Sequence, residues 1–95
     1  MKFEWDQNKN IINQQKHKIS FSTAKLVFQD DNMVDFPDYN HSINEERRIA
    51  IGKVRDILFV CYTVRYEDTI RIISARRANK KEEEIYYDSN GIFGY

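Results

Sequence analysis

The stretch ILFVCYTV at residues 57–64 decides the fold, because it is an almost unbroken apolar run of strand length. Such a run is typical of a central strand that is buried on both faces of a sheet. Residues 47–53 precede it and alternate in polarity, with Ile49 and Ile51 on one face. Short turns at 54–56 and 66–69 flank the central run, and residues 70–75 form the last strand. The middle of the chain therefore predicts an antiparallel sheet.

The last predicted strand carries a basic segment whose side chains should alternate between the two sheet faces. A regular strand would place Arg71 and Arg77 on one face together with Ile73 and Ala75, and Arg76 on the opposite face. We therefore expect Arg71 and Arg76 to point in opposite directions.

Further strands and helices are predicted on either side of this sheet. Residues 3–5 and 33–36 are short strand candidates, and Pro37 ends the second of them. Residues 7–16 predict a polar helix capped by Asp6, with Ile11 and Ile12 as its apolar contacts.

Two more helices are expected. One begins after Ser20 and has a buried face, and the other begins after Asn79, with Glu82 completing a capping box. The buried face of the first consists of Phe21, Ala24, Val27 and Phe28.

The sequence thus predicts a single α+β domain spanning residues 1–95. We expect a small antiparallel sheet of three to four strands, with two N-terminal helices and one C-terminal helix against one face. The composition agrees with a folded domain, since 41% of the residues are hydrophobic and 32% are charged.

A net charge of zero hides a strongly basic middle third. Residues 47–81 contain ten Lys and Arg against three Asp and Glu, whereas residues 1–46 contain five against eight. Seven of the ten are Arg, the side chain best shaped for bidentate contacts to phosphate. This distribution favours a nucleic-acid partner, although a solvated basic sheet face remains the simpler alternative.

Several classes of site have no support in the sequence. His17, His41 and Cys61 lack the spacing of metal ligands, so we expect no metal, and no Gly-rich loop or other motif suggests a cofactor. Cys61 is the only cysteine and lies in an apolar run, which indicates a buried, unreactive thiol in a reducing compartment. No segment resembles a signal peptide or a membrane span, so we expect a cytoplasmic protein without membrane contact.

A basic sheet can support RNA cleavage without a metal, because the 2′-hydroxyl of RNA attacks the neighbouring phosphate. The protein must hold the strand, stabilise negative charge and transfer protons. Candidates for proton transfer are Glu67, His41 or a tyrosine, and the sequence does not choose among them. The remaining catalytic candidates are cations, namely Arg71, Arg76, Arg77 and Lys53. The predicted RNA-binding residues are Arg47, Arg48, Arg65, His41 and Lys80.

Nearly the whole chain resembles the BrnT family of ribonuclease toxins. The opening Phe3-Glu4-Trp5-Asp6, with Lys9, Asn13 and Lys16-His17, is similar to that family's first motif. The strongest fragment is Arg71-Ile72-Ile73-Ser74-Ala75-Arg76-Arg77-Ala78, followed by a charged helix and Tyr86. The middle fragments that match are Ile19-Ser20-Phe21, Ala24, Val27-Phe28, Phe36-Pro37-Asp38, His41, Glu46-Arg47-Arg48 and Ile51-Gly52.

The resemblance implies a compact RelE-like fold and metal-independent action on RNA. It also implies a BrnA-like antitoxin with a DNA-binding domain, and repression through operator DNA. Because two-fold operators require a dimeric DNA-binding part, we expect a complex of two toxins with two antitoxins. The sequence departs from the family in two places. The turn at 53–56 is short and lacks the usual Gly, and the last helix begins with three Glu.

Two other functions stay open at this point. The basic sheet could belong to a nucleic-acid-binding module without catalytic activity, or it could bind an acidic protein partner.

Overall fold

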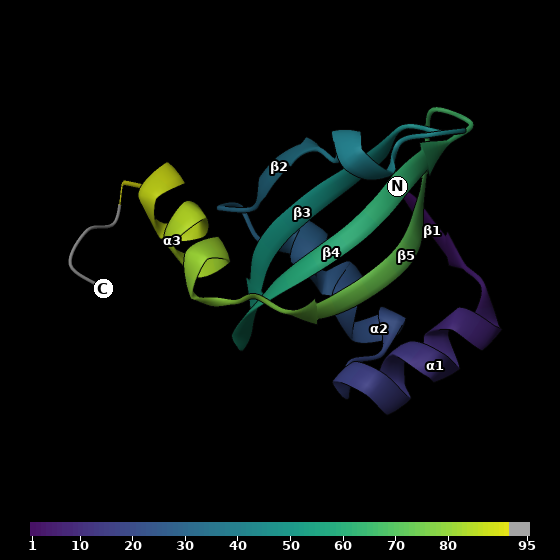
Figure 1. Cartoon of the computed structure of the whole chain (residues 1–95), viewed down its shortest axis with the longest axis horizontal. Coiled ribbons are helices and arrows are strands. Elements are labelled where there is room, and N and C mark those ends of the chain that lie inside the picture. The colour runs from purple at the N-terminus through teal and green to yellow at the C-terminus, as the bar shows by residue number, and fades with distance from the viewer. Residues whose placement is uncertain (92–95) are drawn as a thin grey trace.

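The fold is α+β, with a five-stranded sheet and helices on both sides of it (Figure 1). The computed structural model describes residues 1–91. The strands are β1 (Lys2–Trp5), β2 (Val34–Pro37), β3 (Arg47–Val54), β4 (Asp56–Arg65) and β5 (Thr69–Arg77). The helices are α1 (Gln7–His17), α2 (Phe21–Ala24) and α3 (Lys80–Ser89), with 3₁₀ segments η1 (Lys25–Gln29) and η2 (Tyr39–His41).

The sheet has the order β1-β5-β4-β3-β2 and is mixed rather than antiparallel. β2 to β5 pair antiparallel with their neighbours, whereas β1 pairs parallel with β5. The predicted sheet of three to four antiparallel strands is therefore corrected to five strands in a mixed sheet. A strand of four residues at the chain start carries no periodicity that reveals the direction of its partner.

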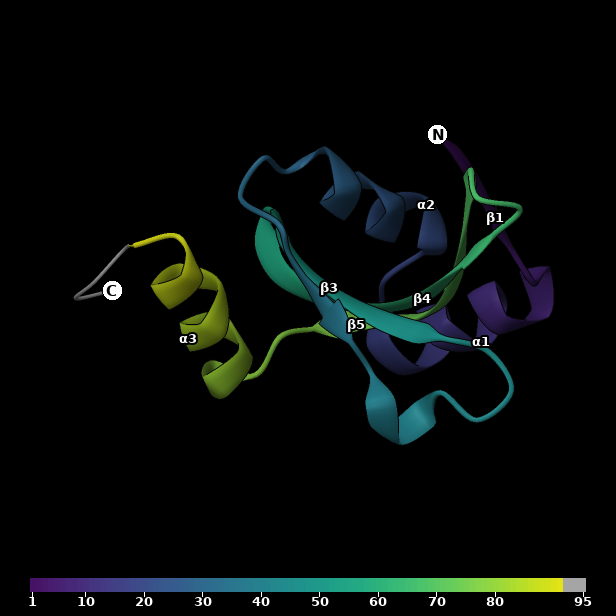
Figure 2. The same ribbon diagram turned by 90° about the horizontal axis from the view of Figure 1, so that it is seen from above.

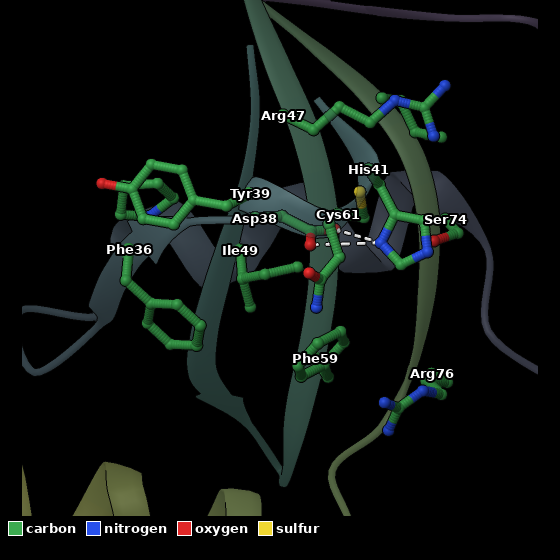
Figure 3. A pocket seen from close by; sticks show the side chains of 13 residues that line it. Phe36, Asp38, Tyr39, His41, Arg47, Ile49, Phe59, Cys61, Ser74 and Arg76 are labelled. Carbon is green, nitrogen blue, oxygen red and sulfur yellow. Dashed lines mark hydrogen bonds and ion pairs between the residues drawn. The ribbon is translucent and has the colours of Figure 1, made fainter. Parts of the chain in front are cut away.

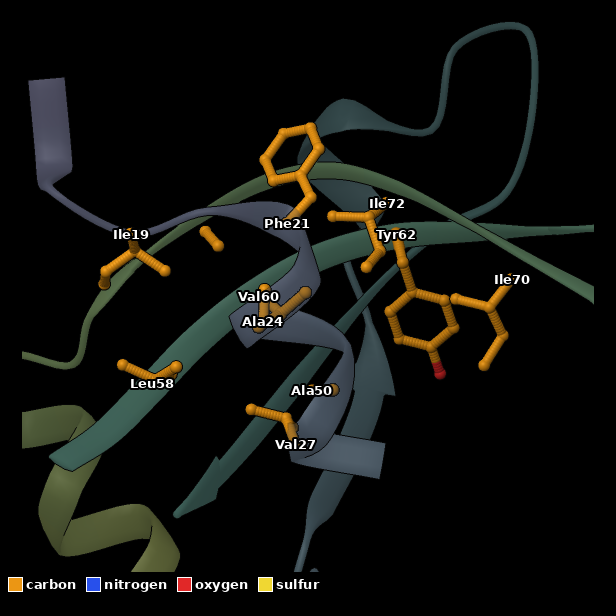
Figure 4. Close-up of a cluster of buried hydrophobic side chains, with 11 residues drawn as sticks. Ile19, Phe21, Ala24, Val27, Ala50, Leu58, Val60, Tyr62, Ile70 and Ile72 are labelled. Carbon is orange, nitrogen blue, oxygen red and sulfur yellow. The ribbon is translucent and has the colours of Figure 1, made fainter. Parts of the chain in front are cut away.

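One face of the sheet is covered by α2 and η1, while η2 lies on the opposite side (Figure 2). Phe21 of α2 and Val27 of η1 share one apolar cluster with Val60 and Ile72 of the sheet, and all four side chains are almost completely buried (Figure 4). Gly52 permits the close approach of η1, because a Cβ there would lie 2.6 Å from Cγ1 of Val27. The predicted second helix is thus confirmed as a short α-helix that continues as a 3₁₀ segment.

Helix α1 begins at the predicted cap but buries residues other than those predicted. The Asp6 side chain accepts hydrogen bonds from the backbone N–H groups of Asn8 and Lys9. Ile11 and Ile12 are about half exposed, so their prediction as the apolar contacts of this helix is wrong. The buried residues are instead Asn10 and Asn13, whose side chains satisfy backbone groups of other segments.

Helix α3 lies at one end of the sheet, on the face opposite to α2 (Figure 2). Its Tyr86 packs with Ile49, Ile51 and Ile57 in a second apolar cluster, and its hydroxyl donates to Asp30 at 2.7 Å. The predicted capping box of Asn79 and Glu82 is confirmed. The expectation that all helices cover the same face is wrong, because the apolar side of α3 meets the other face.

An irregularity in β5 brings Arg71 and Arg76 to the same face. Cys61 of β4 pairs with Ser74 and Tyr62 pairs with Ile72, so Ile73 is an extra residue without a partner. Arg71 then pairs with Thr63 and Arg76 with Phe59, two positions on one face of β4. The predicted opposite orientation assumed a regular strand and is wrong for this reason.

Candidate functional site

The face of the sheet that α2 leaves uncovered contains a groove of about 560 Å³ (Figure 3). Its floor consists of Ile49, Phe59 and Cys61 from the central strands. Segments from β2 and η2 form one wall, and Ser74 and Arg76 of β5 form another. Chain segments that are distant in sequence therefore contribute polar and aromatic side chains to one concave surface.

A histidine and an aspartate form a hydrogen-bonded pair at this groove. Nδ1 of His41 lies 3.1 and 3.0 Å from the two carboxylate oxygens of Asp38. An ionised carboxylate only accepts hydrogen bonds, so Nδ1 carries the proton and Nε2 of a neutral ring is free to accept one. The Asp38 side chain is 16% exposed and that of His41 is 66% exposed, which leaves the imidazole accessible to a ligand.

Local hydrogen bonds explain why η2 holds this pair in place. Oγ of Ser42 donates to the carbonyl of Asp38 at 2.7 Å and accepts from the backbone N–H of Arg47 at 2.9 Å. The backbone N–H of Asp38 also donates to the carbonyl of Arg47 at 2.8 Å. The loop is therefore tied to the start of β3 immediately beside the groove.

Two arginines supply positive charge to the groove. Arg76 donates two hydrogen bonds to Glu82 at 2.7 and 2.9 Å, and its guanidinium carbon lies 4.1 Å from the Phe59 ring centre. The Arg47 side chain has no ion pair among residues 1–91. Arg47 is consequently the groove cation that is available to an anionic ligand without exchanging a partner.

Of the residues predicted from sequence, the groove brings together His41, Arg47 and Arg76. Arg71 and Arg65 share the same sheet face but are paired with Glu4 and Glu45, respectively. They lie toward the end of the sheet where the β4–β5 turn is found (Figure 1).

The other predicted residues lie outside the groove. Arg48 pairs in register with Tyr62 on the helix-covered face and forms ion pairs with Asp35 and Glu46. Glu67 is exposed in the turn between β4 and β5. At the opposite end of the sheet, near α3, lie Lys53, Arg77 and Lys80.

Asp38, Ser74 and the aromatic residues of the groove were not predicted as site residues, although Phe36, Asp38 and Ser74 lie in the sequence fragments quoted above. The spacing Asp-x-x-His at residues 38–41 was the available signal, since it places both side chains on one side of a helical turn. Cys61 behaves as predicted, because burial raises the pKa of its thiol and disfavours a reactive thiolate.

Two further properties concern residues 1–91 as a whole. No group of three or more His, Cys, Asp or Glu side chains in this part of the chain is arranged to hold a metal ion. None of its helices is long and apolar enough to cross a membrane.

Comparisons with known proteins point to one family. The family model described as ribonuclease toxin, BrnT, of type II toxin–antitoxin system matches residues 5–82. The crystal structure of the Brucella abortus ribonuclease toxin BrnT is similar, with a TM-score of 0.66 and 25% sequence identity. That match covers 84% of this chain and 99% of the Brucella chain. No protein of curated function matched the sequence.

Proposed function

Because the chain belongs to the BrnT family of ribonuclease toxins of type II toxin–antitoxin systems, we propose that its open groove cleaves RNA without a metal ion. The observation that carries this proposal is the Asp38–His41 pair, which lies in one groove with Arg47 and Arg76. A base with an orienting carboxylate can remove the proton of the internal hydroxyl, and two cations can stabilise the negative charge that develops on the phosphate.

In the proposed reaction, Nε2 of His41 removes the proton from the 2′-hydroxyl as its oxygen attacks the adjacent phosphorus. The bond from phosphorus to the 5′-oxygen breaks, and the leaving oxygen takes a proton from water that reaches the open groove. The imidazolium of His41 returns its proton to the hydroxide left behind, which restores the neutral ring. The products are a 2′,3′-cyclic phosphate and a free 5′-hydroxyl. Asp38 holds the ring through Nδ1 and stabilises the imidazolium that forms.

The arginines of the groove are proposed to stabilise the phosphate as it gains negative charge. Arg47 is available for this without exchanging a partner, whereas Arg76 is held against Phe59 by Glu82. The predicted cations outside the groove are proposed to hold the RNA backbone on either side of it. These cations are Arg65 and Arg71 toward one end, and Lys53, Arg77 and Lys80 toward the other, while Arg48 is assigned a structural role by its ion pairs. Glu67 is not proposed as a phosphate contact, because its carboxylate would repel the phosphate.

A type II toxin has an antitoxin, and we propose that a BrnA-like protein with a DNA-binding domain neutralises this one in the cytoplasm. Two toxins with two antitoxins would suit the two-fold symmetry of an operator. An antitoxin segment that covers the basic groove would block RNA directly and would associate faster at low salt.

The test is RNA cleavage by the purified protein in the presence of EDTA. A His41→Gln variant purified in parallel reveals any contaminating nuclease, because contamination would persist in it. We expect the wild type to cut in chelator and to leave 2′,3′-cyclic phosphate ends. Activity that disappears in EDTA and returns with Mg²⁺ would contradict metal independence, and RNA binding without cleavage would favour the non-catalytic module.

A further inference from the structure

The groove is divided into an aromatic side and a cationic side (Figure 3). Phe36 and Tyr39 lie on one side of Ile49, over the β2 edge of the sheet, and His41, Arg47 and Arg76 lie on the other. All of these side chains line the same hollow. A ligand that spans the groove would therefore meet a flat apolar ring at one end and positive charge at the other.

Tyr39 is unusual among the aromatic residues at this surface, because it is 84% exposed. It lines two adjacent hollows and so forms the ridge between them. The ring is hardly buried, so it contributes little to the stability of the fold. The backbone around Tyr39 is nevertheless constrained by Pro37 on one side and by the hydrogen bonds of Ser42 on the other. Tyrosine has two main side-chain torsions, so on a constrained backbone it can contact a ligand at low cost in conformational entropy.

We propose that Tyr39, supported by Phe36, is a stacking subsite for an unpaired base of single-stranded RNA. The phosphate next to this base would lie against Arg47. This inference rests on the proposed function and deepens it, since it names the class of RNA that the groove accepts. A nucleotide combines a flat aromatic base with an anionic phosphate, and this combination matches the two sides of the groove.

A stacking subsite of this kind does not favour an intact duplex. Bases in an A-form helix are stacked on one another, so their faces are not available to a protein ring. Stacking on Tyr39 requires a base that is splayed out, as bases in loops and single strands are. An acidic peptide would satisfy Arg47 but would leave the aromatic side without a matching group.

Binding is best measured with a 2′-O-methyl oligoribonucleotide, whose attacking hydroxyl is blocked so that cleavage does not interfere. The variants are Tyr39→Ala and Tyr39→Phe, and Tyr66→Ala is the matched control. Tyr66 is 81% exposed and lies in the turn between β4 and β5, outside the groove. We expect Tyr39→Ala to weaken binding on the order of 5- to 100-fold, because stacking on an aromatic side chain contributes that much per base. Tyr39→Phe retains the ring and should bind like the wild type, as should Tyr66→Ala.

Each other outcome overturns the inference. Binding by Tyr39→Ala at wild-type strength, an equal loss in Tyr66→Ala, or equally tight binding of a blunt duplex would each rule out the subsite. Loss of antitoxin affinity with RNA affinity unchanged would assign Tyr39 to the protein interface instead. Cleavage of unmodified RNA by the wild type is measured in parallel. If it is present, only the subsite fails, and if the wild type neither binds nor cleaves RNA, the proposed function fails with it.

Discussion

The guanidinium of Arg76 and the carboxylate of Glu82 are joined by two parallel hydrogen bonds of 2.7 and 2.9 Å. Glu82 also accepts from the backbone N–H of Asn79, so one carboxylate both starts α3 and fixes a groove cation. Burial would raise the pKa of Glu82, but the hydrogen bonds from Arg76 and Asn79 outweigh it and hold that pKa below its ordinary value. The ion pair therefore links the stability of the last helix to the electrostatics of the candidate site.

Glu82→Gln should lower the free energy of unfolding at neutral pH by about 1–2 kcal/mol, because the charge-assisted pair is lost and is partly screened by solvent. A carboxylate with a depressed folded pKa stabilises the protein above its unfolded pKa of about 4.3 and loses that effect as pH falls through the folded value. The stability difference between wild type and variant should therefore shrink below about pH 4. Urea titrations at several pH values measure it, with the exposed Asp31→Asn as control. A difference that stays constant down to pH 3 would contradict the assignment.

We expect Asn13 to contribute more to the free energy of unfolding than Ile12, its apolar neighbour in α1. Its amide donates to the carbonyls of Ile19 and Ala75 at 2.9 and 2.8 Å and accepts from the backbone N–H of Ala75 at 3.1 Å. Asn13→Ala leaves these buried groups unpaired and should cost at least about 2 kcal/mol. Ile12→Ala, at a half-exposed position, should cost less than about 1 kcal/mol. Chemical denaturation of both variants compares them, and a larger loss for Ile12→Ala would refute this reading of the helix.

Asn13 also shows why part of the fold could not be predicted from sequence. The central strand, its two neighbours and the caps at Asp6, Ser20 and Asn79 follow from local patterns, and the structure has them. Asn13 instead bonds to β5, 62 residues further along the chain. A polar residue on a polar helix gives no local sign that it is buried by such a contact.

The candidate site was predictable only in part for a related reason. The basic segment and the resemblance of its fragments to one family indicated the sheet face and the function. The sheet face on which Arg76 lies depends on the unpaired Ile73 in β5. The alternation of polar and apolar residues along the strand does not indicate this irregularity. The pairing of Asp38 with His41 depends on a 3₁₀ turn inside a loop, and the spacing of three positions between the two residues is its sole sign in the sequence.

Arg47→Ala should weaken RNA binding with little change in stability, because no residue within 1–91 forms an ion pair with this side chain. Removing one phosphate contact should reduce the slope of log affinity against log salt by about 0.7 for a single strand. The measurement is affinity for uncleavable RNA at three or more salt concentrations. Lys9→Ala, an exposed position on α1, should leave the slope unchanged. Equal slopes for wild type and Arg47→Ala would remove Arg47 from the proposed phosphate contact.

His41→Gln should abolish most of the chemical step while leaving the RNA complex intact. Loss of a positioned base typically lowers the rate by about 10²- to 10⁴-fold. Asp38→Asn should have a smaller effect of the same kind, because the ring keeps a neighbour but loses the charge that stabilises its protonated form. His17→Gln is the matched control, since His17 ends α1 and is not part of the groove. Single-turnover cleavage measures the chemical step, and affinity for 2′-O-methyl RNA measures binding. If His41→Gln lost affinity and rate in equal proportion, His41 would be a binding residue and the proton would be taken by another group.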